Sequence, residues 1–321
     1  MDETVRALVL EGSDVVLALF RQPAITGELH TLEHGPFSLV VAPSFGGRIV
    51  SFRKAGRDIL RPATAEAISA ARAYDFAGFP LMPYSGPLFG PGFSFEGHDY
   101  ALDRTVREEP TATHGDAWVG SFQVKDKSAS RLQLQYEHDP APGTFPFRWR
   151  GRLGFALSDE GLRISLAVTS RDHRLMPAGI GYHPYFPKPP GTRLRFDSVA
   201  MWPADAPEAV EQGCGPLVPG LDFTAGADVS EIVVDRLYDG WDQQAELTYP
   251  DGFRTRIIAD GALDKLQLYS AWHYPYVCVE PVSNANDGFN RMARGVASHG
   301  VRVLEPGASI AGSILIDGGP A

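Results

Sequence analysis

Hydrophobic and polar residues alternate with a period of two along most of this chain. Leu162–Ser170 places an aliphatic residue at every second position, and the turn Asp159–Gly161 connects it to another alternating run, Phe147–Ser158. Alternating segments joined by turns that contain glycine are typical of antiparallel hairpins. The pattern therefore predicts a protein built mainly of β-strands.

Further alternating or apolar segments extend this pattern. They are Ser38–Val41, Arg48–Phe52, Asp58–Leu60, Gln244–Tyr249, Phe253–Ala259, Tyr276–Glu280 and Ile310–Ile316. Helical patterns are limited to an Ala-rich segment at Thr64–Tyr74 and a short segment at Asp287–Arg294. Because strands and helices do not alternate and no unit repeats, a doubly wound sheet, a propeller and a solenoid are not expected. We predict one large antiparallel β-sandwich in a single domain over residues 1–321, with loops at Pro187–Gly191 and Pro203–Gly220.

Composition narrows the class of partner. With 29 Lys and Arg against 39 Asp and Glu, the net charge is −10, so nucleic acid is not an expected partner. Met1–Thr4 lacks the basic start of a signal peptide, and Glu11 and Asp14 interrupt the nearby apolar runs Ala7–Leu10 and Val15–Phe20. The cysteines, Cys214 and Cys278, form no zinc motif. We therefore expect a cytoplasmic protein with free thiols and no membrane anchor.

Common catalytic motifs are absent from the sequence. It has no P-loop, dinucleotide fingerprint, Gly-x-Ser-x-Gly or His-Glu-x-x-His. Three segments instead combine histidine or carboxylate with aromatic residues: Thr113–Trp118, Met176–Pro187 and Tyr276–Asn290. Glu280 ends an apolar run and precedes Pro281, which is expected to stop the strand ladder. A carboxylate at this position belongs either at the rim or in a polar cleft, because an unpaired buried Glu is costly.

Together these segments resemble the aldose 1-epimerase family, also called galactose mutarotases. The similar motifs follow one another from about Ser38 to the C-terminus. They are Gly46-Gly47-Arg48-Ile49, Phe79-Pro80-Leu81-Met82-Pro83-Tyr84, His114-Gly115 with Trp118, Gly181-Tyr182-His183-Pro184-Tyr185-Phe186, Asp235-Arg236-Leu237-Tyr238, Leu266-Gln267-Leu268-Tyr269, Val279-Glu280-Pro281 with Asn290, and Leu304-Glu305-Pro306-Gly307. The interval between Gln267 and Glu280 is similar to that of divergent bacterial members. So many motifs in order make the resemblance specific.

The resemblance implies a galactose mutarotase-like supersandwich with its site in a concave cleft. It implies that Glu280 is the general base that takes the proton from the anomeric hydroxyl, and that His183 is the general acid that protonates the ring oxygen. His114, Asp235 and Gln267 are implied to position the sugar, with Trp118 and Tyr185 among its contacts. Trp241 and Trp272 are further candidates for stacking on a sugar face.

The chemistry of mutarotation independently needs such a pair. Opening the hemiacetal removes a proton from O1 and adds one to O5, and closing it after rotation of C1 gives the other anomer. One base and one acid suffice, so neither a metal nor a cofactor is expected. A Glu carboxylate and a His that titrates near neutral pH fit these two roles.

One departure from the family bears on the substrate. The family usually carries Asn-Arg after the Pro-Tyr segment, whereas this chain has Ser85-Gly86-Pro87-Leu88. Gly86 and Pro87 have no polar side chain, so the Arg contact to the sugar is missing. We therefore expect plain galactose and glucose to be weak substrates and a modified sugar to be better. Arg53, Arg72 and Arg148 are candidates for meeting an anionic group, but a solvated surface position is the more ordinary one for each.

Three alternatives stay open at this point. A hexose-6-phosphate mutarotase would need basic residues at the rim of the cleft. A non-catalytic carbohydrate-binding protein of the same fold would bind sugar without turnover. A glycoside hydrolase would use Asp235 and Glu280 as its paired carboxylates. The oligomeric state has no signature in the sequence.

Overall fold

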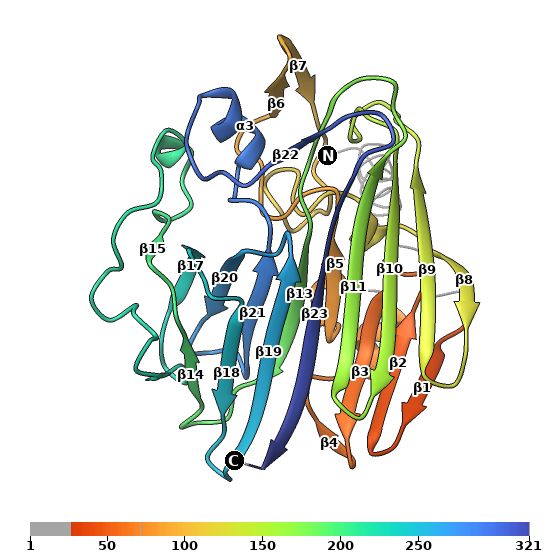
Figure 1. The fold of residues 1–321 in the computed structure, drawn as a ribbon, viewed down its shortest axis with the longest axis vertical. Coiled ribbons are helices and arrows are strands. Elements are labelled where there is room, and N and C mark those ends of the chain that lie inside the picture. Colours follow the sequence, from red (N-terminus) through yellow and green to blue (C-terminus); the bar gives the residue numbers. More distant parts are fainter. Residues whose placement is uncertain (1–26, 71, 321) are drawn as a thin grey trace, which may run out of the picture.

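The computed structural model describes residues 27–70 and 72–320. Strands are its main secondary structure, and most of these strands belong to two large antiparallel sheets (Figure 1). The prediction of a mainly β fold is confirmed, because strands dominate and the helices are short. The expectations about Met1–Thr4 and the apolar runs up to Phe20 concern residues outside the described part of the chain.

The first large sheet contains ten strands of the described chain, in the order β1-β2-β3-β5-β13-β21-β20-β17-β15, with β4 paired to β3. Their bounds are β1 His30–His34, β2 Phe37–Ala42, β3 Arg48–Lys54, β4 Arg57–Asp58, β5 Gly78–Leu81, β13 Gly181–Pro187, β15 Ala200–Met201, β17 Val234–Asp239, β20 Lys265–Ser270 and β21 Tyr276–Val282. Among its central strands, β20 and β21 are consecutive in the sequence, whereas β5 and β13 come from distant parts of the chain. Non-local pairing therefore brings the candidate motifs side by side.

The second large sheet contains nine described strands, in the order β16-β14-β18-β19-β23-β11-β10-β9-β8. Their bounds are β8 Gln123–Lys127, β9 Arg131–His138, β10 Trp149–Ser158, β11 Gly161–Ser170, β14 Arg193–Phe196, β16 Ala227–Asp228, β18 Gln244–Thr248, β19 Phe253–Gly261 and β23 Ser309–Pro320. Two predicted hairpins are confirmed here, β10 with β11 and β18 with β19.

The remaining elements are short. β6 Gly92–Phe95 pairs with β7 His98–Ala101, and β12 Met176–Ala178 pairs with β22 Arg302–Leu304. The α-helices are α2 Ala65–Ala70 and α3 Gly288–Ala293, and the 3-10 turns are η1 Ala73–Asp75, η2 Ala117–Val119 and η3 Pro207–Ala209. Both predicted helical segments are confirmed, although the first is split into α2 and η1.

Side-chain alternation divides the central strands of the first sheet between two layers. On β21, Val277 and Val279 join the main core between the sheets, together with Leu266 and Leu268 of β20. Cys278, at the intervening position of β21, joins a smaller apolar cluster on the opposite face. Apolar side chains therefore lie on both faces of this sheet. Because one face packs against the second sheet, only the opposite face can carry a site.

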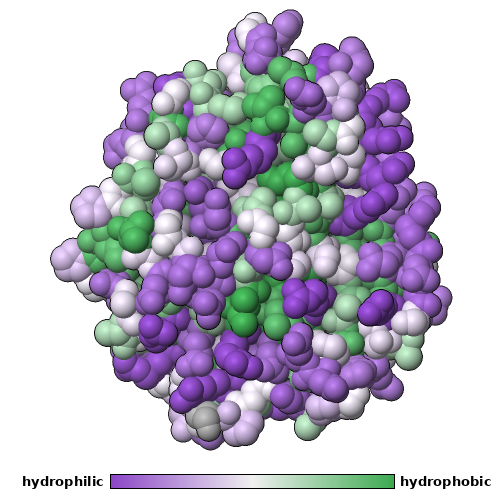
Figure 2. All heavy atoms as spheres, in the orientation of Figure 1, coloured by the Kyte–Doolittle hydropathy of each residue, from purple (hydrophilic) through white to green (hydrophobic). Residues whose placement is uncertain are grey.

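The surface agrees with this distribution of apolar residues. Hydrophilic residues cover most of the face shown in Figure 2, and hydrophobic residues there form small separate groups. Among the described residues, no helix has the length and apolar character needed to span a membrane. Cys278 is buried and Cys214 partly so, and neither thiol is in a disulfide.

Candidate active site

A cavity of about 400 Å³ opens on the face of the first sheet that carries Glu280 and His183. Six of the seven predicted site residues line it: His114, His183, Tyr185, Asp235, Gln267 and Glu280. Trp118 does not.

 Five of these six residues lie on strands β13, β17, β20 and β21 of the sheet. The sixth, His114, reaches the cavity from the loop before η2.

Strand register places His183 directly beside Glu280. Gly181 pairs with Val282 and Tyr185 with Cys278, so the same register sets His183 opposite Glu280. Residues paired across two antiparallel strands point to the same face. The expectation that Pro281 stops the ladder is wrong: β21 continues to Val282. The prolines Pro184 and Pro281 fall in a gap in the pairing of β13 with β21, so their missing N–H groups cost the sheet no bond there.

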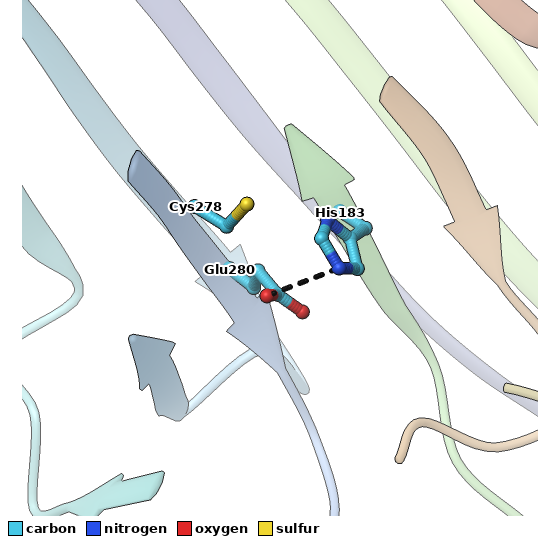
Figure 3. A group of neighbouring side chains, drawn as sticks. All are labelled: His183, Cys278 and Glu280. Carbon is cyan, nitrogen blue, oxygen red and sulfur yellow. Dashed lines mark ion pairs between the residues drawn. The ribbon is translucent and has the colours of Figure 1, made fainter. Parts of the chain in front are cut away.

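The two side chains touch in the buried floor of the cavity. His183 Nε2 lies 3.3 Å from Glu280 Oε1, and Figure 3 shows the imidazole and the carboxylate facing each other from neighbouring strands. Glu280 is only 2% exposed, so of its two expected environments it occupies the cleft. Phe79 and Tyr185 pack against the His183 ring at centroid distances of 4.8 and 4.7 Å and fix its orientation.

Burial governs the protonation of this pair. It raises the pKa of Glu280 well above its ordinary value, with a smaller contribution from the negative charge of Asp235. It lowers the pKa of His183 well below its ordinary value, with smaller contributions from His114 and Arg61. Both shifts disfavour charge in a site poor in water. Together they favour a neutral pair that holds one proton, on Glu280 while no ligand is bound.

His114 faces the cavity as a neutral hydrogen-bond donor. Its backbone adopts φ 61°, and its Nδ1 accepts a 3.0 Å hydrogen bond from the backbone N–H of Gly86. Since Nδ1 is the acceptor, the proton of the neutral ring is on Nε2. Burial lowers the pKa of His114 to about 3, which keeps the ring neutral. The predicted role in positioning a ligand is compatible with this arrangement.

Asp235 and Gln267 form a second polar pair at the cavity wall. Gln267 Nε2 donates a 2.6 Å hydrogen bond to Asp235 Oδ1. Restricted access to water raises the pKa of Asp235 to about 6, with a further contribution from the charge of Asp205. Gln267 stands opposite Glu280 in the pairing of β20 with β21. The acid–base pair and the amide–carboxylate pair therefore occupy adjoining parts of one sheet face.

Trp118, which was predicted to contact the sugar, lies behind the cavity wall. Trp118 is fully buried and does not line the cavity, because Phe79 covers it at a centroid distance of 4.9 Å. The carbonyl of Trp118 instead accepts hydrogen bonds from the buried Arg48 guanidinium. Trp118 thus supports the wall from behind. Trp241, which is buried, and Trp272, which is 69% exposed, are also outside the cavity lining.

Several lining residues were not predicted from the sequence. They are Tyr74, Ser85, Gly86, Pro87, Glu109, Thr113, Asp205, Tyr269, Tyr274, Tyr276, Val282 and Asn286. Alternation could have found Tyr269 and Tyr276, which lie an even number of residues from Gln267 and Glu280 on the same strands. No sequence signal marks Asp205, which comes from the predicted loop Pro203–Gly220.

One group of side chains has the composition of a metal site. His183, Cys278 and Glu280 each offer one ligand atom, and these atoms lie within 4.8 Å of one another (Figure 3). Burial raises the pKa of the Cys278 thiol well above its ordinary value, whereas a metal needs the thiolate. Cys278 is also absent from the cavity lining. The donor set therefore fits an acid–base pair with a neutral thiol behind it better than a metal centre.

Comparisons with known proteins agree with the fold and the motifs. An uncharacterised Escherichia coli K12 protein, YphB, is 29% identical over 276 residues, which are 82% of this chain and 90% of that protein. A crystal structure from Escherichia coli K12, provisionally assigned as an aldose 1-epimerase, has a TM-score of 0.81 and 26% identity, covering 92% of this chain and 99% of that chain. A galactose mutarotase-like protein from Clostridium acetobutylicum has a TM-score of 0.79 at 17% identity, covering 91% and 95%, and shows the fold alone.

A family model also matches most of the chain. The model described as aldose 1-epimerase matches residues 28–317, which include the cavity and both of its polar pairs. On this match, the chain belongs to the aldose 1-epimerase family.

Proposed function

We propose that this protein is a mutarotase that interconverts the α and β anomers of an aldose or aldose derivative. The observation that carries the proposal is the contact of His183 Nε2 with Glu280 Oε1 at 3.3 Å. O1 and O5 of a pyranose are bonded to the same carbon, so an acid and a base that serve both atoms must be neighbours. Membership of the aldose 1-epimerase family supports the same reaction class.

The proposed mechanism moves one proton in and one proton out. The proton of the pair first passes from Glu280 to His183 Nε2 across their 3.3 Å contact. The Glu280 carboxylate then removes the proton from O1 while His183 donates its proton to O5. The C1–O5 bond breaks and C1 becomes an aldehyde carbon. Rotation about the C1–C2 bond presents the other face of the carbonyl to O5. Closure reverses the transfers, so the pair again holds one proton and no electrons are exchanged.

The surrounding groups are proposed to orient the sugar. His114 Nε2 can donate to a sugar oxygen, and Asp235 can accept from a hydroxyl. Tyr185 stacks on the His183 ring and holds it against Glu280. These positions support binding in one pose, which acid–base catalysis requires because the proton acceptor and donor must lie within hydrogen-bond reach of O1 and O5.

Direct observation of mutarotation tests the proposal. Freshly dissolved α-anomers of a panel of aldoses are followed by polarimetry, and the rate of approach to equilibrium is expected to increase in proportion to enzyme concentration. A sugar that binds without any increase in rate would identify a binding protein instead. Release of reducing sugar from a glycoside would identify the hydrolase alternative.

The pH dependence of kcat/KM follows from the single proton of the pair. Because burial lowers the pKa of His183 below 6.5, a second proton is added only in acid, and the base is then lost. Because burial raises the pKa of Glu280, the last proton leaves only well above 4.5, and the acid is then lost. We expect a bell-shaped profile with its acid midpoint below 6.5, to which Asp235, with a pKa of about 6, contributes. Activity that falls on acidification with a midpoint above neutral pH would contradict this assignment.

Replacing His114 with Asn is expected to affect KM at least as much as kcat. The change removes one neutral hydrogen bond to the sugar, worth ~0.5–1.5 kcal/mol, or a rise in KM of roughly 2- to 12-fold. Initial rates over a range of sugar concentrations separate the two constants. Thermal unfolding is the control, because the Gly86 N–H loses its acceptor in this variant. A loss confined to kcat would assign His114 to the chemical step.

A further inference from the structure

The cavity lining carries negative charge and no positive charge. Four carboxylates line it, those of Glu109, Asp205, Asp235 and Glu280, and no Lys or Arg does. Apart from Glu280, none of the four has an ion-pair partner among the residues that the structure describes. Their hydrogen bonds come from neutral groups: the Tyr74 hydroxyl donates to Glu109, the Asn286 amide to Asp205 and the Gln267 amide to Asp235.

The nearest arginines are engaged elsewhere. Arg61 donates to the carbonyls of Tyr74 and Phe76 and lies over the Tyr185 ring. Arg291 donates to several backbone carbonyls, including that of Asn286, and Arg236 donates to the carbonyl of Asp235. Because these guanidinium groups bind backbone oxygen atoms, they do not pair with the carboxylates of the cavity. Asp205 and Asp235 are exposed on the cavity wall, where restricted access to water raises the pKa of both, although the charges of Arg291 and Arg236 act in the opposite direction.

The side-chain oxygen of Gln267 is a second feature of the cavity that favours a ligand with a hydrogen-bond donor. Gln267 is only 8% exposed, and its side chain lines the cavity. Its Nε2 donates to Asp235, whereas its buried Oε1 has no hydrogen-bond partner in the described chain. A buried acceptor left unpaired is costly, so a ligand that brings an N–H or O–H donor to this place is favoured. The unpaired amide oxygen and the Asp235 carboxylate meet the same part of the cavity.

The loop that departs from the family pattern adds to the negative charge. Gly86 has φ 76°, and a Cβ on it would lie 1.9 Å from Asn286 Oδ1, so only glycine leaves room for the Asn286 side chain. Asn286 in turn donates a 2.6 Å hydrogen bond to Asp205 Oδ2. At the place where the family usually has a cationic Arg, Gly86 therefore leaves room for the Asn286 amide. This amide holds the Asp205 carboxylate in the cavity lining.

We infer that the sugar taken by this cavity carries a protonated amino group. This inference rests on the proposed mutarotase function and names the class of its substrate, an amino sugar. An ammonium group donates three hydrogen bonds and supplies an ion-pair partner to carboxylates that have none among the described residues. A phosphorylated sugar would bring negative charge to four carboxylates. Arg53, Arg72 and Arg148, the arginines considered for an anionic group, pair with surface carboxylates instead.

A substrate panel tests the inference on the unmodified protein. The panel holds 6-amino-6-deoxyglucose, 2-amino-2-deoxyglucose and 2-amino-2-deoxygalactose, with glucose, galactose, N-acetylglucosamine and glucose 6-phosphate for comparison. Polarimetry at about pH 6.5 keeps the amines protonated and Asp235 mostly ionised. A charge-assisted hydrogen bond supports an expected advantage in kcat/KM of about 10- to 100-fold for at least one amino sugar over its neutral counterpart. That advantage should decline with added salt.

Failure of the inference and failure of the proposed function give different results. If a neutral hexose or the phosphate is turned over as fast as the amino sugars or faster, the inference is overturned and the mutarotase remains. If no sugar is turned over, the mutarotase proposal fails, and calorimetric titration with the amino sugars and glucose still tests whether the cavity prefers the cation.

Variants identify the carboxylates responsible. In Asp205→Asn, the ratio of kcat/KM for the preferred amino sugar to that for glucose should fall about tenfold, and Glu109→Gln tests the second carboxylate in the same way. Asp126→Asn, an exposed strand position outside the cavity, makes the same change in net charge and should leave the ratio unchanged. An equal fall in all three variants would show that net charge, not the cavity, sets the preference.

Discussion

Replacing Glu280 with Gln is expected to lower kcat by about 10²- to 10⁴-fold, the range that a general base contributes. The amide has nearly the shape of the carboxylate and keeps an oxygen for His183, but it cannot accept the O1 proton. The site also accommodates the neutral Gln side chain, because burial raises the pKa of Glu280 and so already favours an uncharged group there. Sugar affinity, measured by calorimetry, should change little, so the loss should be in kcat and not in KM.

A neighbouring position provides the control for Glu280→Gln. Cys278 lies two residues away on β21, is fully buried and does not line the cavity. Cys278→Ser therefore changes the packing behind the acid–base pair without removing an acid or a base, and its kcat should stay within a few-fold of the original. Near-normal mutarotation by Glu280→Gln would remove Glu280 from the mechanism. A loss in Cys278→Ser as large as that in Glu280→Gln would give the thiol a part in the reaction.

Replacing His183 with Asn should be comparably damaging, with kcat lower by about 10²- to 10⁴-fold. Asn cannot deliver a proton to O5, and it also removes the ring that packs between Phe79 and Tyr185. The double variant with Glu280→Gln should be much less than multiplicatively slower, because the two side chains pass one proton and act as a unit. Single-turnover and steady-state rates for both single variants and the double variant provide the comparison.

Two further histidines make this result interpretable. His138 is buried outside the cavity, where its Nε2 contacts the carbonyl of Phe145, so His138→Asn should lower thermal stability but not kcat. His114→Asn should act mainly on KM, as argued above. A double variant whose loss equals the product of the two single losses would show that His183 and Glu280 act independently. A larger loss of kcat in His114→Asn than in His183→Asn would reverse the roles of the two cavity histidines.

Much of the fold follows from local pattern. The alternating runs predict β10, β11, β18 and β19 to within a few residues, because a strand with one face toward a core must place its apolar residues at every second position. The same alternation determines that Cys278 and Glu280 share a face of β21. Glycine-containing turns then predict which consecutive strands form hairpins. Pro281 shows the limit of local rules: a missing N–H ends a strand only where a partner strand needs it.

The site divides in the same way between local and non-local information. The motifs point to Glu280 and His183 as the candidate reactive residues, but their contact depends on the pairing of β13 with β21, which are about a hundred residues apart in the chain. Tertiary structure alone decides that Trp118 lies behind Phe79, since burial depends on which side chain packs in front.

The charge of the cavity is likewise a tertiary property. Asp205 comes from a loop without alternation, and only the folded chain brings its carboxylate to the same cavity as Asp235, with no ion-pair partner for either among the described residues. The sequence by itself determined many of the strands and their faces and pointed to the candidate acid and base, because these depend on neighbours in the chain. The cavity, its lining and its electrostatics were decided by the packing of distant segments, because charge interactions depend on distance in space.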